Sequence, residues 1–300
     1  MNQYLEVSFI VVNYNGIKDT RELLISIENF VQHLSYEVIV VDNGSVINEA
    51  ALLIIEFPKF KILRSEKNLG FSGGNNLGIR ASRGNYLMFI NNDTLLTDCS
   101  ISELVKILKN DSSIGAVSPK IHFFYPSNTI QFAGFTELTK ITLRNRTIGN
   151  NELDSGQYDT PASTASTHGA AMMVKREVIE NIGYMPEIYF LYYEEHDWCA
   201  SMRRNGYRLV YQPKALVIHK DSQSTGSDSY LKRYYLTRNR LLFAYRNRRG
   251  IIRILAIVYQ LVIADPKLVL LSLLKRRKDL ALASFNGVID FFCLKNKSSN

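Results

Sequence analysis

The sequence is poor in cysteine and lacks a long uninterrupted apolar run. Its three cysteines, at positions 99, 199 and 293, are far apart and form no CxxC pair. A disulfide scaffold and a cysteine-rich zinc module are therefore disfavoured, and the composition fits a reducing compartment. The first residues show no basic region followed by an apolar stretch, so we expect no secretory signal peptide.

What is present is the composition of a folded protein with an unevenly placed charge. The 300 residues are 46% hydrophobic and 21% charged, which suits one large domain with an extension, or two domains. Residues 231–300 carry 15 Lys/Arg and 3 Asp/Glu, a net +12, whereas the whole chain is only +8 and residues 1–230 are therefore −4. A mildly acidic body and a basic tail suggest two different functions, and we expect the tail to bind anionic lipid or nucleic acid.

Short apolar segments alternate with helical periodicity through the first ninety residues. The pattern predicts strands at 7–12, 38–41, 60–64 and 86–90, separated by helices at 20–34, 48–57 and 75–81. Such alternation is typical of an α/β fold whose mostly parallel sheet is covered on both faces. Residues 144–167 predict a long loop, which is often a functional lid. Strands are predicted again at 169–174, 208–211 and 216–219, with helices at 176–182 and up to residue 204.

The C-terminal part differs in character from the body. Residues 220–230 are small and polar, so we expect an α/β domain over 1–225 and a helical extension over 226–300. The apolar stretch 251–274 is interrupted by Arg253 and by Asp265-Pro266-Lys267, which leaves clean runs of about 11 and 7 residues against the ~20 that a spanning helix needs. Two short helices lying on a membrane surface are the expectation.

Polar residues follow the predicted strands, where ligands bind in open parallel sheets. Asp42 begins a turn and is placed to accept from a base or a ribose, or to cap the next helix. The glycine-rich stretch 68–78 suits a close approach to phosphate or ribose, but it has neither GxGxxG nor GxxxxGK[ST] spacing and also fits a flexible turn. Asp93 follows the strand at 86–90 and suits a cation shared with phosphate oxygens, although turn chemistry explains it equally. His219 ends the last strand and is structural unless Asp93 lies nearby.

Three carboxylates are concentrated within four residues at Glu194, Glu195 and Asp197. Crowded like charges raise the pKa of at least one member, which suits a general base. The alternative is a solvated helix start, favoured by the helix dipole. The aromatic residues Tyr192, Tyr193 and Trp198 around the cluster favour the functional interpretation.

Together these segments and their order resemble the family 2 glycosyltransferases, in particular bacterial rhamnosyltransferase-like members that build surface polysaccharides. The resemblance covers residues 7–220 and extends weakly to 234–240. It is carried by six ordered motifs: VSFIVVNYNG (7–16), VIVVDNGS (38–45), NLGFSGGNNLGI (68–79), GNYLMFINNDT (84–94), GAAMMVKREVIENIGYMPE (169–187) and YYEEHDWCASMRRNGYRLVYQPKALVIHK (192–220).

The resemblance implies a GT-A fold, which is Rossmann-like, and an inverting transfer from a nucleotide-sugar. Asp42 would contact the nucleobase, with Asn13 and Tyr14 lining the same pocket. Gly74, Asn75 and Asn92 would lie beside the nucleotide.

The resemblance also implies where the chemistry happens. Asp93 would bind Mg²⁺ or Mn²⁺ at the diphosphate, and His219 would complete that metal site. Glu195 would be the base that deprotonates the acceptor, with Glu194 and Asp197 ranked behind it. Two departures from the family pattern stand out: Asn91 replaces the first acid of the DxD motif, and Glu195 replaces an aspartate.

The same resemblance suggests the partners. The donor is expected to be dTDP-rhamnose, with a UDP-sugar as runner-up, and the acceptor a growing or polyprenyl-diphosphate-linked glycan. A basic, apolar tail would hold the enzyme at an anionic membrane, which implies a cytoplasmic protein peripheral to the inner membrane face. Two alternatives remain open: a sugar-nucleotide-binding protein without activity, and a tail that binds nucleic acid. The apolar stretch 251–274 argues against nucleic acid.

Overall fold

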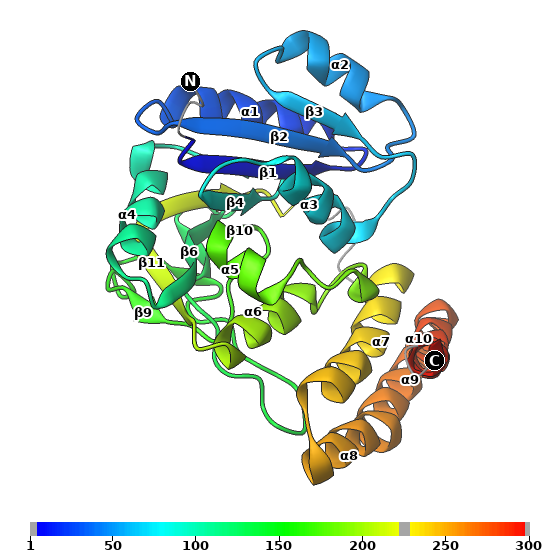
Figure 1. Ribbon diagram of the computed structural model, residues 1–300. Coiled ribbons are helices and arrows are strands. Elements are labelled where there is room, and N and C mark those ends of the chain that lie inside the picture. Colours follow the sequence, from blue (N-terminus) through cyan, green and yellow to red (C-terminus); the bar gives the residue numbers. More distant parts are fainter. Residues whose placement is uncertain (1–4, 222–228, 298–300) are drawn as a thin grey trace.

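The computed structural model describes residues 5–221 and 229–297. Most of the linker predicted at 220–230, together with the domain boundary at 225, lies outside the described residues. An α/β body and a group of C-terminal helices are arranged side by side (Figure 1).

The first half of the sheet matches the predicted alternation. Four parallel strands lie in the order β3 (Lys61–Arg64), β2 (Tyr36–Asp42), β1 (Val7–Asn13), β4 (Tyr86–Ile90). The helices between them are α1 (Ile17–Phe30), α2 (Glu49–Glu56) and α3 (Gly70–Ala81). β1, β2 and β4 form where apolar runs are buried on both faces, as parallel packing requires.

The second half of the sheet is mixed, so the prediction of a mostly parallel sheet is wrong there. β10 (Ala171–Lys175) lies antiparallel between β4 and β6 (Ile114–Phe123). β11 (Arg208–His219) runs parallel to β6, and β5 (Thr94–Leu95) pairs with its last residues. The two strands predicted within 208–219 are one strand with a register shift between Gln212 and Leu216, because Pro213 cannot donate to the ladder.

The remaining elements of the body are short. α4 (Ser102–Asn110) covers the sheet, and α5 (Arg176–Ile182) and α6 (Glu194–Arg204) follow β10. The predicted loop at 144–167 contains two two-residue strands, β8 (Glu152–Leu153) and β9 (Ala162–Ser163), which pair with β7 (Thr129–Phe132) and β11.

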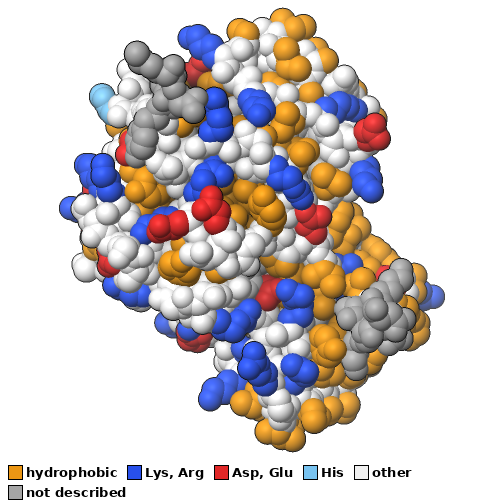
Figure 2. Space-filling model, in the orientation of Figure 1, with side chains coloured by type: hydrophobic (Ala, Val, Ile, Leu, Met, Phe, Trp, Pro, Cys, Tyr) orange, Lys and Arg blue, Asp and Glu red, His pale blue; other side chains and the backbone are white. Residues whose placement is uncertain are grey.

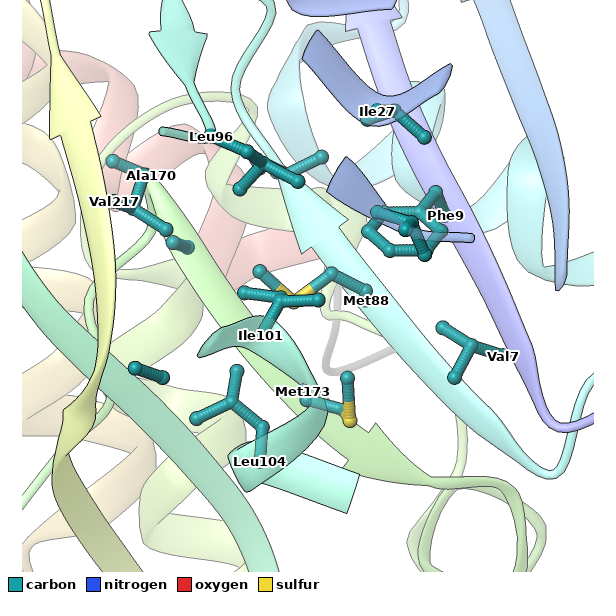
Figure 3. Packing of buried hydrophobic residues seen from close by; sticks show 14 of the residues in the cluster. Val7, Phe9, Ile27, Met88, Leu96, Ile101, Leu104, Ala170, Met173 and Val217 are labelled. Atoms are coloured by element: carbon teal, nitrogen blue, oxygen red, sulfur yellow. The ribbon is translucent and has the colours of Figure 1, made fainter. Parts of the chain in front are cut away.

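The main core lies between the sheet and the helices on one of its faces. Figure 3 shows Phe9 of β1 and Met88 of β4 facing Ile27 and Leu104, which come from the covering helices. Trp198 of α6 packs edge-on against Phe89, 5.6 Å between ring centroids, on the opposite face of β4. Burial on both faces fixes the ends of β1, β2 and β4, where the site is built.

The C-terminal helices are α7 (Tyr230–Asn247), α8 (Gly250–Tyr259), α9 (Asp265–Leu274) and α10 (Lys278–Lys297). A π-helical turn, Gln260–Ala264, joins α8 to α9, so the two predicted short helices form one continuous 25-residue helix. The residues Asp265-Pro266-Lys267 lower the local hydropathy, but the helix continues through them. Pro266 lies in the first turn after the π-helical turn, where the loss of its backbone N–H is tolerated.

That helix is long and apolar enough to cross a membrane, by length and composition alone. Only 22% of its most apolar window is buried against the rest of the described chain. Apolar side chains gather over this part of the molecule (Figure 2). The exposed ones include Ile251, Ile254, Val262, Leu270 and Leu274. The prediction of two short helices rested on the lengths of the apolar runs, which do not show that residues 250–274 form one helix.

Candidate functional site

The structure brings the predicted site residues to one edge of the sheet. Asn13 and Asp42 are paired at the ends of β1 and β2, and Asp93 follows β4. His219 ends β11, which pairs with β5 directly after Asp93. Carboxyl ends of strands from distant parts of the chain therefore meet here, as expected for a ligand site in an α/β sheet.

Asp93 and His219 are in direct contact. Nε2 of His219 lies 3.1 Å from Oδ1 of Asp93, and both side chains are largely buried, at 8% and 13% exposure. Nδ1 of His219 lies 2.8 Å from Oε1 of Gln131. An oxygen lies at each ring nitrogen, and a proton on Nδ1 directed at Gln131 would leave the Nε2 lone pair to coordinate a metal.

The donor atoms of this pair fit a divalent cation that is also bound by phosphate. Among residues 5–221 and 229–297, no three His, Cys, Asp or Glu side chains gather in a metal-binding group. Two protein ligands are sufficient when substrate phosphates and water fill the other positions, as is common for Mg²⁺. The carboxylate and imidazole of Asp93 and His219 are the residues that would hold it.

Asp42 is fully buried and already hydrogen-bonded. Its Oδ1 accepts from the backbone N–H of Ser45, and its Oδ2 accepts from that of Ala50 and from Nη1 of Arg64 at 2.6 Å. The side chain is 0% exposed, so a nucleobase would reach it only after the 43–48 loop moved. In this conformation Asp42 holds that loop to the sheet.

The other predicted nucleotide residues also have internal partners. Asn13 donates to Glu49 and accepts from Thr20, whereas Asn75 donates to the Phe71 carbonyl. Only Tyr14, at 47% exposure, presents a broad open surface.

Two residues of this group serve close packing. Asn92 donates to the Gly16 carbonyl and to Thr20 Oγ1. Gly74 lies so close to β1 that a Cβ there would come within 2.8 Å of Val12, so the glycine is needed for helix–sheet packing. Its place in a Gly-rich motif therefore has a structural cause in addition to any contact with a ligand.

Sequence reasoning missed Arg64 and Glu49, which organise this edge. Arg64 also donates to the Ser45 carbonyl, and Glu49 accepts from Asn13, Ser45 and the Gly16 N–H. The sequence offers little indication of these two roles, because a basic residue at a strand end and an acid in the first turn of a helix are both common.

The acidic cluster begins α6, after a loop in an unusual conformation. Phe190, Tyr192 and Tyr193 have φ angles of 64°, 68° and 75°. Left-handed backbone at bulky residues costs free energy and persists only where the surroundings enforce it, often at functional sites.

Glu194 and Glu195 point into the protein. Among the residues described, Oε2 of each is buried and lacks a hydrogen-bond partner. Burial, followed by repulsion from Glu195, raises the pKa of Glu194 well above that of an ordinary carboxyl. The raised pKa disfavours the charged form of Glu194, which favours Glu195 as the base.

Asp197 has a different environment. Its Oδ2 accepts from Nε of Arg246 at 2.7 Å and its Oδ1 from Nδ2 of Asn247 at 2.6 Å. The carboxylate is 4% exposed and ties α6 to the end of α7. This arrangement suits a structural link better than proton transfer.

Two residues of α7 hold the strained loop from the other side. Nδ2 of Asn239 donates to the carbonyls of Tyr189, Leu191 and Tyr192, at 3.0, 2.6 and 2.8 Å. Arg238 donates to the Tyr189 carbonyl at 2.5 Å and to Oδ1 of Asn239. We call Arg238 and Asn239 the loop clamp. Sequence reasoning noted 234–240 only as a weak extension of the resemblance and assigned these residues no role.

A row of rings connects the acidic cluster to the Asp93–His219 pair. His196 of α6 packs against Phe135, which stacks on His168 at 5.8 Å between centroids. His168 in turn lies 6.3 Å from the ring of His219. Burial lowers the pKa of His168 to about 3, so this ring is neutral at neutral pH. A chain of ring contacts therefore links α6, which carries the acids, to His219.

Comparison with known proteins identifies related sequences. Residues 8–183 match the family described as glycosyl transferase family 2. The hexosyltransferase Agl10 of low-salt glycan biosynthesis in Haloferax volcanii is 28% identical over 242 residues, which cover 79% of this chain and 75% of that protein. The dTDP-rhamnosyl transferase RfbF of Shigella flexneri is 25% identical and covers 79% of each chain. The N-acetylglucosaminyl-diphospho-decaprenol L-rhamnosyltransferase of Mycobacterium tuberculosis is 25% identical over 67% of this chain and 74% of its own.

Among solved structures, the mannosyltransferase PcManGT from Pyrobaculum calidifontis, in complex with GDP-Man and Mn²⁺, superimposes with a TM-score of 0.59. The match covers 99% of this chain and 80% of that one at 17% identity. At this identity the likeness shows the fold, which is the α/β GT-A fold with a mixed sheet and a C-terminal helical region.

Proposed function

Because the chain belongs to glycosyl transferase family 2 and is a glycosyltransferase that uses a nucleotide-sugar, we propose that it inverts the anomeric centre of a donor bound at the Asp93–His219 edge. The contact between Asp93 and His219 carries this proposal. A carboxylate and an imidazole in contact at the carboxyl ends of the strands support a cation and diphosphate site there.

Different residues of this chain would bind the cation and accept the proton. Asp93 and His219 would hold Mg²⁺ or Mn²⁺, and the cation, when bound, would stabilise the charge that develops on the leaving diphosphate. Glu195 would accept the proton of the acceptor hydroxyl, and Glu194, whose pKa is raised by burial and by Glu195, would remain beside it. Attack from the side opposite the leaving group inverts the configuration.

The donor is proposed to be dTDP-rhamnose, with a UDP-sugar second. The relatives whose names specify rhamnosyl transfer support this choice. Exposed Tyr14 offers a ring for stacking beside the edge, and opening of the 43–48 loop would bring Asp42 to the base.

The acceptor is proposed to be a lipid-linked or growing surface glycan, with the C-terminal helices at an anionic membrane. The +12 charge of residues 231–300 and the exposed apolar side chains of the continuous helix support it. The protein would then act at the cytoplasmic face of the cell membrane. Sedimentation with anionic and with neutral vesicles tests this; full-length protein left in the supernatant with both would contradict it.

The decisive experiment is calorimetric titration of UDP and dTDP into wild type and Asp93→Ala, each with and without Mn²⁺. We expect Mn²⁺-dependent binding of one nucleotide and a loss of at least about tenfold in Asp93→Ala. If folded wild type binds neither nucleotide, the transferase assignment to this edge fails. Binding without turnover of any sugar-nucleotide would instead favour the inactive binding protein.

A further inference from the structure

A cavity lies away from the Asp93–His219 edge, between the body and the C-terminal helices. It has a volume of about 440 Å³, within the roughly 300–1,000 Å³ typical of small-molecule sites. Its walls come from the 143–145 segment, from α7 and from α9, and they share no residue with the group around Asp93.

The cavity is lined by four cations, Arg144, Lys232, Arg233 and Arg240. Asp265 is buried at the start of α9 near Arg233 and Arg240. The described residues that line the cavity include these four basic side chains and no Asp or Glu, so its walls are basic. Arginine and lysine together are the side chains that bind phosphate groups.

The cavity is next to the acidic cluster. Tyr193 lines it and immediately precedes Glu194. The hydroxyl of Tyr193 accepts from Nε of Arg240 at 2.9 Å and donates to the Leu143 carbonyl at 3.3 Å. A group anchored by these cations would thus hold an attached sugar close to the two buried carboxyls.

The cavity also borders an apolar surface. Leu236 and Leu268 form part of its wall, and Leu268 belongs to the continuous helix whose exposed side chains include Leu270 and Leu271. A ligand that combines a doubly charged phosphate group with a hydrocarbon chain matches both parts. A free nucleotide or inorganic diphosphate would use the cations alone.

We infer that this basic cavity binds the diphosphate of an isoprenoid-diphosphate-linked acceptor, with its hydrocarbon chain against α9. The inference rests on the proposed function for the identity of the acceptor. It adds a second anion site, distinct from the donor edge, and it assigns the C-terminal helices a role in substrate binding as well as in membrane association.

The test uses full-length protein in non-ionic detergent and three probes: farnesyl diphosphate, farnesol and inorganic diphosphate. Binding is measured by calorimetry for wild type and for Arg144→Gln/Lys232→Gln, a pair chosen because Arg144 is exposed and Lys232 half-buried. Lys59→Gln/Lys109→Gln removes the same charge from exposed positions of the body and is the matched control. UDP and dTDP are titrated into all three proteins.

We expect farnesyl diphosphate to bind wild type and the control alike, and at least about tenfold more weakly to the cavity variant. Farnesol should not bind, inorganic diphosphate should bind more weakly than the lipid, and nucleotide affinity should be the same in all three proteins. Equal affinity for farnesyl diphosphate in the cavity variant and wild type would overturn the inference. So would a parallel loss of nucleotide binding, which would make the cavity part of the donor site, or equal affinity for inorganic diphosphate.

The two proposals fail separately. If nucleotides bind and farnesyl diphosphate does not, the donor edge stands and the cavity inference is wrong. If farnesyl diphosphate binds through Arg144 and Lys232 while nucleotides do not bind, the cavity stands as a diphosphate site and the proposed function is wrong.

Discussion

Nε2 of His219 lies 3.1 Å from the carboxylate of Asp93, although the two residues are 126 positions apart in the chain. The contact arises because β11 runs along β6 and its last residues pair with β5, the two-residue strand that starts directly after Asp93. This pairing brings His219, which the residue pattern alone marks as structural unless Asp93 lies nearby, into contact with that acid.

His219→Gln should reduce Mn²⁺-dependent nucleotide binding by about tenfold or more, because glutamine removes the imidazole nitrogen while keeping a polar side chain. Calorimetry with and without Mn²⁺ measures this. Binding in the absence of metal is the internal control and should not change. If nucleotide binding by His219→Gln depended on Mn²⁺ as it does in wild type, His219 would not be a metal ligand.

Glu195→Gln and Glu194→Gln should differ sharply in turnover. A glutamine at position 195 removes the proposed base and should lower kcat by about 10²–10⁴-fold. A glutamine at position 194 resembles the uncharged form of the carboxyl, which burial favours, so kcat should change little. Sugar transfer is assayed with nucleotide affinity as the control for folding. Equal losses in both variants would contradict the assignment of the base.

The raised pKa of Glu194 predicts how stability changes with pH. Between the ordinary carboxyl pKa and the raised folded-state value, the folded protein binds one more proton than the unfolded chain, so this group's contribution is full at low pH and is lost as pH rises. Glu194→Gln should therefore unfold at a higher temperature than wild type at alkaline pH, with the difference shrinking as the pH falls to 5. Thermal melts from pH 5 to pH 9 test this; a constant difference would rule out titration of Glu194.

Asn239→Ala should slow the reaction while leaving donor binding intact. Removing the amide leaves the carbonyls of Tyr189, Leu191 and Tyr192 without that donor and releases the loop before Glu194. We expect kcat to fall by about tenfold or more with the nucleotide dissociation constant unchanged. Asn205→Ala, which removes an exposed amide bonded to the Ser201 carbonyl, is the control. A loss of nucleotide binding equal to the loss in kcat would indicate general unfolding.

Arg64→Ala should destabilise the protein more than Arg21→Ala. Arg64 pairs with the fully buried carboxylate of Asp42, and its removal leaves that acid with fewer donors, at a cost of about 1–3 kcal/mol. Arg21 pairs with Glu56 where both side chains are more than one third exposed and solvent screens the pair, so we expect a smaller loss. Urea unfolding of the two variants measures the difference. Equal losses would mean that Asp42 does not depend on Arg64.

The sequence alone determined the order of the elements through β4 and the family, because local hydropathy and turn residues suffice to define buried strands and the ordered motifs. It also placed Asp42, Asp93 and the acids at 194–197 on ends of strands or helices, since those positions follow directly from where apolar runs stop. Roles based on residue type alone were less certain: Asp197 and Gly74 have structural partners that only packing reveals.

Tertiary structure decided everything that depends on segments distant in the chain. It inserted β10 antiparallel into the sheet, brought His219 to Asp93, and placed Asn239 on the loop before Glu194. It also made 250–274 one helix, because a π-turn carries the backbone past Pro266, whereas hydropathy registers only the polar residues there. Local sequence specifies local conformation; contacts across the chain are set by how buried surfaces fit together, and the site is made of such contacts.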